Sequence, residues 1–229
     1  MNEKCYAVLT AGGESSGPGS PYTAQLMEDA DGRPIYLYTV EALAGSGLFE
    51  EIILYVPAGI APAVKRRLAE ALPDAPVTVL AGNPSQLEAA LQTADRIPDA
   101  PDTVLVLHDL LRPFVTDRIL QEAAETARRS GVCDTAVPSA DTLFVSGNGE
   151  DIDRIPDRQN LFQEQAPQAV RADLLKKHAE AAGKSGAADV CSALHGLGVQ
   201  IFLVRGEAAN IRIASPAERR AARALLEEG

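Results

Sequence analysis

Short apolar runs alternate with stretches of helical spacing through the first half of the chain. The runs are continuous, as in strands buried on both faces, and they cover residues 5–9, 51–56, 76–80 and 102–107. Between them, apolar residues recur at helical spacing, which predicts helices over residues 34–44, 62–72 and 85–94. This order indicates an α/β fold, with a Rossmann-like, mostly parallel sheet and helices on both faces. The strongly apolar run at 102–107 is expected to be central in the sheet.

The next segment predicts a helix, a strand and then a projecting arm. Residues 116–130 are expected to be helical and residues 133–137 to form a strand. Two strand-like runs, 141–145 and 150–155, flank a glycine-asparagine turn, which predicts a β-hairpin. Because this hairpin has little apolar surface to bury on its own, we expect residues 139–158 to form an arm that pairs with another subunit.

The last third of the chain is expected to be mixed. Residues 157–170 read as extended and polar, and two short extended runs are expected at 199–205 and 209–213. Helical segments, the second of them a helix or a turn, are expected at 171–182 and 188–197, with a final helix from residue 216.

Composition and charge exclude several classes of protein. The 229 residues, 46% of them hydrophobic, fit one large domain. The formal net charge of -11 argues against a nucleic-acid binder and against a protein that binds anionic membranes. No apolar run reaches the about 20 residues that span a bilayer. The N-terminus lacks the pattern of a signal peptide, so we expect a cytoplasmic protein.

Candidate chemistry follows two of the predicted strands. The first strand leads into Thr10-Ala11-Gly12-Gly13, and glycine-rich loops of this kind present backbone N–H groups to phosphates. The fourth leads into His108-Asp109-Leu110-Leu111-Arg112-Pro113. Because the carboxyl ends of parallel strands share one edge of the sheet, the two loops should lie close together. Asp109 is placed to bind a metal or a substrate hydroxyl and Arg112 a phosphate; alternatively, the two side chains pair with each other.

The glycine-rich loop lacks the cations that a triphosphate site requires. Between Lys4 and Arg33 there is no basic residue, while several carboxylates are present. The sequence therefore shows the backbone pattern of a nucleotide site without its usual positive side chains.

Five motifs in register resemble the 2-C-methyl-D-erythritol 4-phosphate cytidylyltransferases and the related ribitol-5-phosphate cytidylyltransferases over nearly the whole chain. They are Thr10-Ala11-Gly12-Gly13, His108-Asp109-x-x-Arg112-Pro113, Asp141-Thr142-Leu143, Gln165-Ala166-Pro167-Gln168 and Asn210-Ile211-Arg212-Ile213. The resemblance implies a single nucleotidyltransferase-like domain over residues 1–229, a homodimer joined through the arm, and Mg²⁺ as cofactor. It implies transfer of CMP from CTP to a sugar-alcohol phosphate with release of pyrophosphate.

The resemblance also implies roles for individual residues. Arg212 and Asp109 would be catalytic, with Asp109 also a ligand of Mg²⁺. Arg158 would reach the acceptor phosphate in the partner's site. The other expected substrate-binding residues are Arg112, Gln165, Asp141 and Thr142. The expected nucleotide-binding residues are Ala11, Gly12, Gly13, Gly82 and Ser85.

The chain departs from the family mainly on the CTP side. The Arg and Lys of the family's first loop and the Arg of its second nucleotide loop have no counterpart here, and Leu110 and Leu111 replace two alanines, which is expected to narrow the pocket. These departures keep two alternatives open. The first is a catalytically impaired homologue that acts as a dimeric binding or regulatory protein, and the second is an unrelated α/β domain with chance motif matches.

Overall fold

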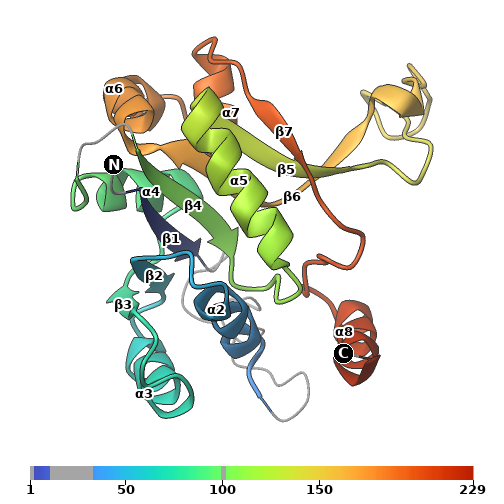
Figure 1. The fold of residues 1–229 in the computed structure, drawn as a ribbon. Helices are drawn as coiled ribbons and strands as arrows, with labels where there is room; N and C mark the ends of the chain where they lie inside the picture. Colours follow the sequence, from blue (N-terminus) through green and yellow to red (C-terminus); the bar gives the residue numbers. More distant parts are fainter. Residues whose placement is uncertain (1–2, 11–32, 99–101, 229) are drawn as a thin grey trace.

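The computed structural model of the chain describes residues 3–10, 33–98 and 102–228. Within these residues, the centre is a seven-stranded sheet with the order β3-β2-β1-β4-β6-β5-β7 (Figure 1). The strands are β1 (Lys4–Thr10), β2 (Glu51–Val56), β3 (Val77–Ala81), β4 (Thr103–Asp109), β5 (Val132–Pro138), β6 (Phe162–Arg171) and β7 (Phe202–Arg205). Neighbouring strands are parallel except at β6, which is antiparallel to β4 and β5. The predicted α/β class, the mostly parallel sheet and the central place of β4 are confirmed.

Helices cover both faces of the sheet because alternate side chains of each central strand point to opposite sides. Val104 and Val106 of β4 belong to one apolar cluster, and Leu105 and Leu107 to the other. The first cluster includes residues of α2 (Ile35–Gly45), α3 (Ala61–Ala71), α5 (Asp117–Ser130) and α8 (Pro216–Glu228). The second includes residues of α4 (Gln86–Ala94), α6 (Ala172–Gly183) and α7 (Val190–Gly196).

The segment after the arm forms a short helix and then a strand. A short 3-10 helix, η1 (Arg158–Asn160), leads into β6, which is paired on both sides, and residues 166–170 are buried. The predicted extended conformation is confirmed over Phe162–Arg171, and the polar residue Gln168 is accommodated there because its buried amide is hydrogen-bonded. Residues 209–213, expected to be a short extended run, belong to no strand; polar groups of Asn210 bond to other segments instead.

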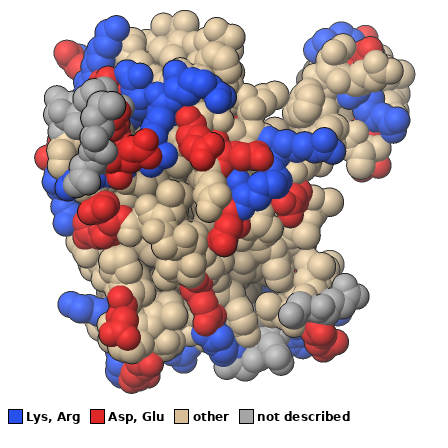
Figure 2. All heavy atoms as spheres, in the orientation of Figure 1, with Lys and Arg blue, Asp and Glu red and all other residues tan. Residues whose placement is uncertain are grey.

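The predicted hairpin is wrong in its secondary structure. Residues 139–158 leave the sheet between β5 and β6 and stand off the body of the molecule (Figures 1 and 2). In this segment the structure describes one antiparallel bridge, between Val145 and Arg154, and no strand. Side chains hold the turn: Ser146 Oγ accepts from the N–H of Gly149 at 2.8 Å, and Asp153 Oδ2 accepts from Gly147 at 2.6 Å. Figure 2 also shows that acidic and basic side chains are interleaved over the face of the molecule seen in this view.

The two strand ends that carry the motifs lie side by side, as predicted. Thr10 is in register with Asp109, and the N–H of Leu110 donates to Thr10 O at 3.2 Å. The chain that follows β7 returns to the same place, since Ile213 N donates to Leu111 O at 2.8 Å. In the described part of the chain, no helix combines the length and the apolar character needed to cross a bilayer.

Candidate active site

A cavity of about 460 Å³ opens at the carboxyl edge of the sheet. The end of β5, the start of β6, the turn after β4 and the segment after β7 all contribute to its wall. Its polar lining consists of Arg112, Gln163, Glu164, Gln165, Asn210, Arg212 and Glu218. The structure therefore brings together three of the expected site residues, Arg112, Gln165 and Arg212, with Asp109 directly beside them through its bond to Arg212.

Asp109 is paired with Arg212 across 103 residues of sequence. Its Oδ2 accepts from Arg212 Nε at 2.5 Å, and its Oδ1 accepts from the N–H of Leu111 at 2.9 Å. The side chains are 19% and 38% exposed, so the ion pair is only partly screened by water. The alternative pairing of Asp109 with Arg112 is not among the ion pairs that the structure gives for the described residues. Arg212 lines the cavity, so the pair places a fixed cation in the cavity wall.

Arg112 is held at two points. Its Nη1 donates to the backbone oxygen of Asn210 at 2.8 Å, and its own carbonyl accepts from Nε2 of His108 at 2.9 Å. His108 is buried, and this burial lowers the pKa of its imidazole to about 4, so the ring is neutral near pH 7. Because a carbonyl can only accept, Nε2 carries the proton. His108 thus fixes the turn from which Arg112 reaches the cavity.

Leu110 and Leu111 do not narrow the cavity, and that expectation is wrong. Both side chains are fully buried in the apolar cluster beneath α2 and α5, and neither lines the cavity. The carbonyl of Leu110 is bonded by Thr39 Oγ1 at 2.8 Å, which fixes the backbone in this orientation. The leucines therefore anchor the turn that carries Asp109 and Arg112.

Gln165 joins β6 to the segment after β7. Its Nε2 donates to Glu207 O at 2.8 Å, and its Oε1 accepts from the Glu207 N–H at 3.2 Å. A Cβ on Gly206 would collide with this Oε1, so the close approach requires glycine. Gln165, an expected substrate-binding residue, thus lines the cavity, and its amide holds the segment at Glu207 in place.

Three carboxylates surround one amide behind the cavity. Nε2 of Gln168 lies 3.2 Å from Asp134, 2.9 Å from Glu164 and 3.0 Å from Asp189. An amide has two hydrogens, so three acceptors cannot all be satisfied. Burial, and then the neighbouring Glu164 and Asp189, raise the pKa of Asp134 to about 7. Burial and Asp189 also raise the pKa of Glu164.

The expected nucleotide-binding residues are not gathered at this cavity. Ala11, Gly12 and Gly13 lie outside the described residues. Ser85 lines a separate hollow of about 320 Å³ beside α4, and Gly82 precedes it in the same loop. There Ser85 caps α4: its Oγ accepts from Glu88 N at 3.2 Å, and Glu88 Oε2 accepts from Ser85 N at 2.7 Å.

The arm residues of the expected site also lie apart from the cavity. Asp141 and Thr142 are exposed at the base of the arm. Arg158 is exposed as well, and its Nη1 donates to Ala140 O at 3.1 Å. Ala140 is the arm residue that lines the cavity. Within one chain, therefore, the structure does not bring Asp141, Thr142 or Arg158 to Arg112 and Arg212.

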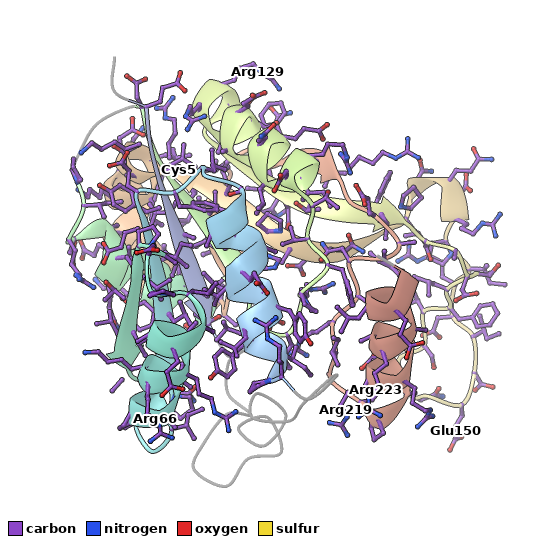
Figure 3. The ribbon with its side chains drawn as sticks, turned by 60° about the horizontal axis from the view of Figure 1, so that its bottom comes forward. Cys5, Arg66, Arg129, Glu150, Arg219 and Arg223 are labelled. Carbon is purple, nitrogen blue, oxygen red and sulfur yellow. The ribbon has the colours of Figure 1, made fainter. Side chains whose placement is uncertain are left out.

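Other cations near the carboxyl edge come from α2 and α8. Arg33 precedes α2, forms a 3.1 Å ion pair with Glu41 and stacks 4.9 Å from the centre of the Tyr38 ring. Arg219 and Arg223 project from α8, the helix that also contains the cavity residue Glu218 (Figure 3).

A metal site made of protein groups is not found. The described residues hold no cluster of three or more His, Cys, Asp or Glu side chains able to bind a metal ion. Asp109 Oδ1 accepts from Leu111 and Oδ2 from Arg212, and carboxylate oxygens are also the kind of ligand that Mg²⁺ binds. Mg²⁺ is commonly held by one or two carboxylates together with phosphate oxygens and water. Asp109 therefore fits as a single protein ligand of that kind.

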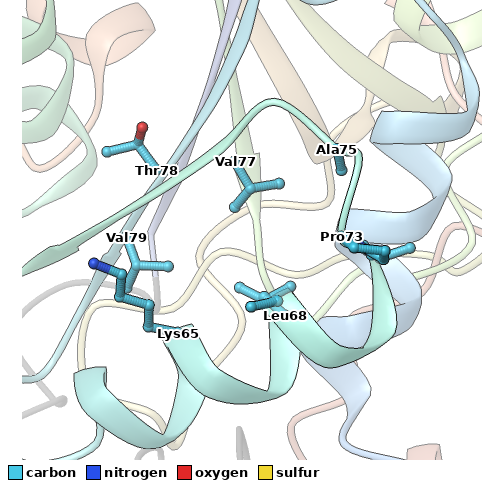
Figure 4. A pocket seen from close by; sticks show the side chains of 9 residues that line it. Lys65, Leu68, Pro73, Ala75, Val77, Thr78 and Val79 are labelled. Atoms are coloured by element: carbon cyan, nitrogen blue, oxygen red, sulfur yellow. The ribbon is translucent and has the colours of Figure 1, made fainter.

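A further hollow lies beside β3, the outermost strand on the other side of the sheet, and its lining is mostly apolar. It measures about 260 Å³ and is formed between α3 and β3, where Leu68, Pro73, Val77 and Val79 make most of the visible wall (Figure 4). Lys65 is its one charged lining residue. This aliphatic hollow offers no counterpart to the Asp109–Arg212 pair.

Sequence reasoning missed several residues of the cavity wall. Gln163 and Glu164 precede the Gln165-Ala166-Pro167-Gln168 motif, and Asn210 begins the motif that contains Arg212. Because these three residues lie within or next to the motifs, the motifs could have identified them as cavity residues. Val137, Pro138 and Ala208 are also in the wall, and no local pattern distinguishes them.

Comparisons with known proteins agree with this arrangement. The family model for IspD, 2-C-methyl-D-erythritol 4-phosphate cytidylyltransferase, matches residues 5–228. The solved 4-diphosphocytidyl-2C-methyl-D-erythritol synthase of Anaerococcus prevotii is similar with a TM-score of 0.83, 22% identity, and coverage of 99% of this chain and 100% of that one.

The 2-C-methyl-D-erythritol 4-phosphate cytidylyltransferase of Thermus thermophilus is similar with a TM-score of 0.74 and 25% identity, over 96% of this chain and 98% of that one. The corresponding enzyme of Francisella tularensis gives a TM-score of 0.72 at 19% identity, over 96% and 98%. At these identities the structures establish the fold, while the family model covers nearly the whole sequence. The chain therefore belongs to the IspD family of 2-C-methyl-D-erythritol 4-phosphate cytidylyltransferases.

Proposed function

We propose that the protein transfers CMP from CTP to 2-C-methyl-D-erythritol 4-phosphate and releases pyrophosphate. The observation that carries the proposal is the convergence of Arg112, Arg212 and the Asp109 carboxylate at one cavity of about 460 Å³. Two guanidinium groups suit phosphate oxygens, and the polar wall suits the hydroxyl groups of a sugar alcohol. The family match supports the same substrates.

The chemistry asks the protein mainly to position and neutralise its reactants. An oxygen of the acceptor phosphate attacks the α-phosphorus of CTP, a new P–O bond forms, and the bond to the pyrophosphate leaving group breaks. The attacking oxygen is already anionic, so no side chain must remove a proton. Arg112 would hold the acceptor phosphate, and Arg212, fixed by Asp109, would stabilise charge on the phosphates in the transition state.

Mg²⁺ would add positive charge at the phosphates, with Asp109 as its protein ligand. Ala11, Gly12, Gly13, Gly82 and Ser85 remain proposed nucleotide contacts, because glycine-rich loops present backbone N–H groups to phosphate. A cytoplasmic location also stays a prediction from the sequence. The binding-protein alternative is not supported by the family match, and that match excludes an unrelated domain.

We expect the purified protein with Mg²⁺ to release pyrophosphate only when CTP and the acceptor are both present. In Arg112→Ala, the KM for the acceptor should rise about 10- to 100-fold, because a charged contact to its phosphate is lost. The KM for CTP should change much less. A coupled assay of pyrophosphate measures both constants. Absence of release at millimolar substrates, or an equal change in both KM values, would contradict the proposal.

We also propose that the chain forms a homodimer through the arm, residues 139–158. Several large apolar side chains on this segment are exposed in the single chain, among them Phe144 at 57%, Ile152 at 56% and Ile155 at 59%. Exposed apolar groups gathered on a projecting segment favour association. In such a dimer, Arg158, which lies apart from the cavity of its own chain, would reach the acceptor phosphate in the cavity of the partner chain.

The double variant Phe144→Asp/Ile155→Asp should be monomeric at concentrations where the native protein is dimeric, because two charges would be buried in the interface. Sedimentation equilibrium measures the association. Leu203→Asp is the matched control, since Leu203 on β7 is equally exposed, at 58%, but lies off the arm. A monomeric native protein, or dissociation by Leu203→Asp alone, would refute the arm interface.

A further inference from the structure

Asn210 is a fully buried polar residue in the loop that carries Arg212. Its exposed fraction is 0%, and it is one of few buried polar side chains outside the strands and helices of the described chain. Its Nδ2 donates to the backbone oxygen of Ala166 at 2.7 Å. The assignment of this atom is forced, because the Ala166 carbonyl can only accept. Oδ1 is buried and has no hydrogen-bond partner among the described residues, so the side chain is held by this single bond.

The backbone of Asn210 makes two more bonds that point to the candidate site. Its carbonyl accepts from Nη1 of Arg112 at 2.8 Å. Its N–H donates to Glu207 O at 3.0 Å, which closes a tight turn before the residue. The amide bond to Ala166 therefore fixes the place of a carbonyl that in turn fixes the Arg112 guanidinium.

Asn210 also restricts the position of Arg212. Arg212 follows two positions later and reaches Asp109 with Nε at 2.5 Å. The next residue, Ile213, is tied to Leu111 O at 2.8 Å. The segment 210–213 is thus attached to β6 at Asn210 and to the turn after β4 at its other end, with Arg212 between the two attachments.

We propose that Asn210 is a positioning residue that sets both arginines of the site, Arg112 through its backbone carbonyl and Arg212 through the length of the short segment. This inference rests on the proposed cytidylyl transfer. A side chain with no donor at position 210 leaves Ala166 O unpaired and frees the segment from β6. The guanidinium groups then lose their fixed geometry, although neither is altered chemically.

The test is a pair of double-mutant cycles built on Asn210→Ala. Alone, this variant should lower kcat/KM for the acceptor about 100-fold, the size expected for misplaced reacting groups. Its effect on the acceptor KM should disappear in an Arg112→Ala background, and its effect on kcat should disappear in an Arg212→Ala background. Asn210→Ser keeps a hydrogen-bond donor, so it should recover part of the lost kcat/KM. If Asn210→Ala folds poorly, Asn210→Ser replaces it in the same cycles.

Thr93→Val is the matched control for loss of a buried polar group. Thr93 is 0% exposed and bonds to the Tyr55 hydroxyl at 3.2 Å, on the opposite face of the sheet. It should lower stability without changing either kinetic constant. Fully multiplicative effects of Asn210→Ala with both arginine variants, or native kinetics for Asn210→Ala, would overturn the inference.

Failure of the proposed function can be told apart from failure of this inference. If the native protein shows no pyrophosphate release, the function is wrong, and amide hydrogen exchange then tests Asn210 by itself. Asn210→Ala should speed exchange at residues 109–112 and 207–213 together, while Thr93→Val should not. Unchanged exchange at residues 109–112 would show that Asn210 does not hold the Arg112 turn.

Discussion

Replacing Arg212 by alanine should lower kcat for pyrophosphate release by a factor of about 100 to 1,000, the usual cost of losing one charged transition-state contact. The loss should fall on kcat more than on either KM, because Arg212 is proposed to act on charge that develops during transfer. Its removal also leaves the partly buried Asp109 carboxylate without the Nε donor at 2.5 Å. Steady-state kinetics at saturating CTP and acceptor measure the effect.

Two further variants make this result interpretable. Arg212→Lys keeps the positive charge but not the planar fork, so it should recover only part of kcat. Arg66→Ala removes an exposed arginine of α3, far along the sheet from the cavity (Figure 3), and should retain native kinetics. An Arg212→Ala enzyme within about threefold of native kcat would remove Arg212 from the proposed mechanism.

Replacing Asp134 by asparagine should raise the free energy of unfolding at pH 8, by roughly 2–4 kcal/mol from a pKa near 7. In the unfolded chain this carboxyl has a pKa near 3.8, so between about pH 4 and 7 the native state binds more protons than the unfolded state. The contribution of this group to native stability therefore falls as the pH rises from about 4 to about 7. The gain from Asp134→Asn should be small near pH 4, grow up to about pH 7 and then level off.

Urea unfolding of the native and Asp134→Asn proteins between pH 5 and 8.5 measures this gain. The low pKa of His108 affects both proteins equally and cancels in the difference. Asp173→Asn is the control of opposite sign, because the Arg171 guanidinium holds the pKa of Asp173 below its usual value. That variant should lose stability above pH 4. A gain for Asp134→Asn that does not depend on pH would show that the three carboxylates around Gln168 do not share this strain.

The strained carboxylate cluster lies directly behind the cavity, since Glu164 belongs to both. Glu164 lines the cavity and accepts from Gln168 at 2.9 Å, and Arg112 lies near enough to lower its pKa in part. Asp134 itself is on β5 and does not line the cavity. The partly buried Asp134 carboxylate, which lowers the stability of the fold, therefore lies next to the residues proposed to bind the acceptor. Destabilising groups are common near functional sites.

The elements of the first half were determined by local sequence. Continuous apolar runs predicted β1, β2, β3 and β4 to within two residues, because strands buried on both faces leave no room for polar positions. The parallel order then predicted that the ends of β1 and β4 lie side by side, as they do, since strands that point one way end at one edge. Asp109 and Arg112 were named from the same strand-end pattern, whereas Arg212 was named from the resemblance to the cytidylyltransferases.

The structures of the arm and β6 are not determined by local sequence alone. Residues 141–155 have strand-like composition, but a lone two-stranded ribbon has little to bury, and the structure keeps a single bridge there. Residues 162–171 look polar, yet they form a strand between β4 and β5 because Gln168 finds partners only after β5 and α7 are in place. Long-range partners, not propensity, decided both segments.

The pairing of the site residues was likewise decided by tertiary structure. From the sequence, Arg112 was the nearest cation to Asp109, but the turn after β4 points Arg112 at Asn210 O and brings Arg212 to Asp109 from 103 residues away. The burial of Leu110 and Leu111, which turns them from pocket walls into anchors, follows from α2 and α5 covering that face. The sequence by itself determined which residue types stand at the strand ends; the packing of three distant segments determined which of them meet, because hydrogen bonds and ion pairs depend on distances that chain order does not specify.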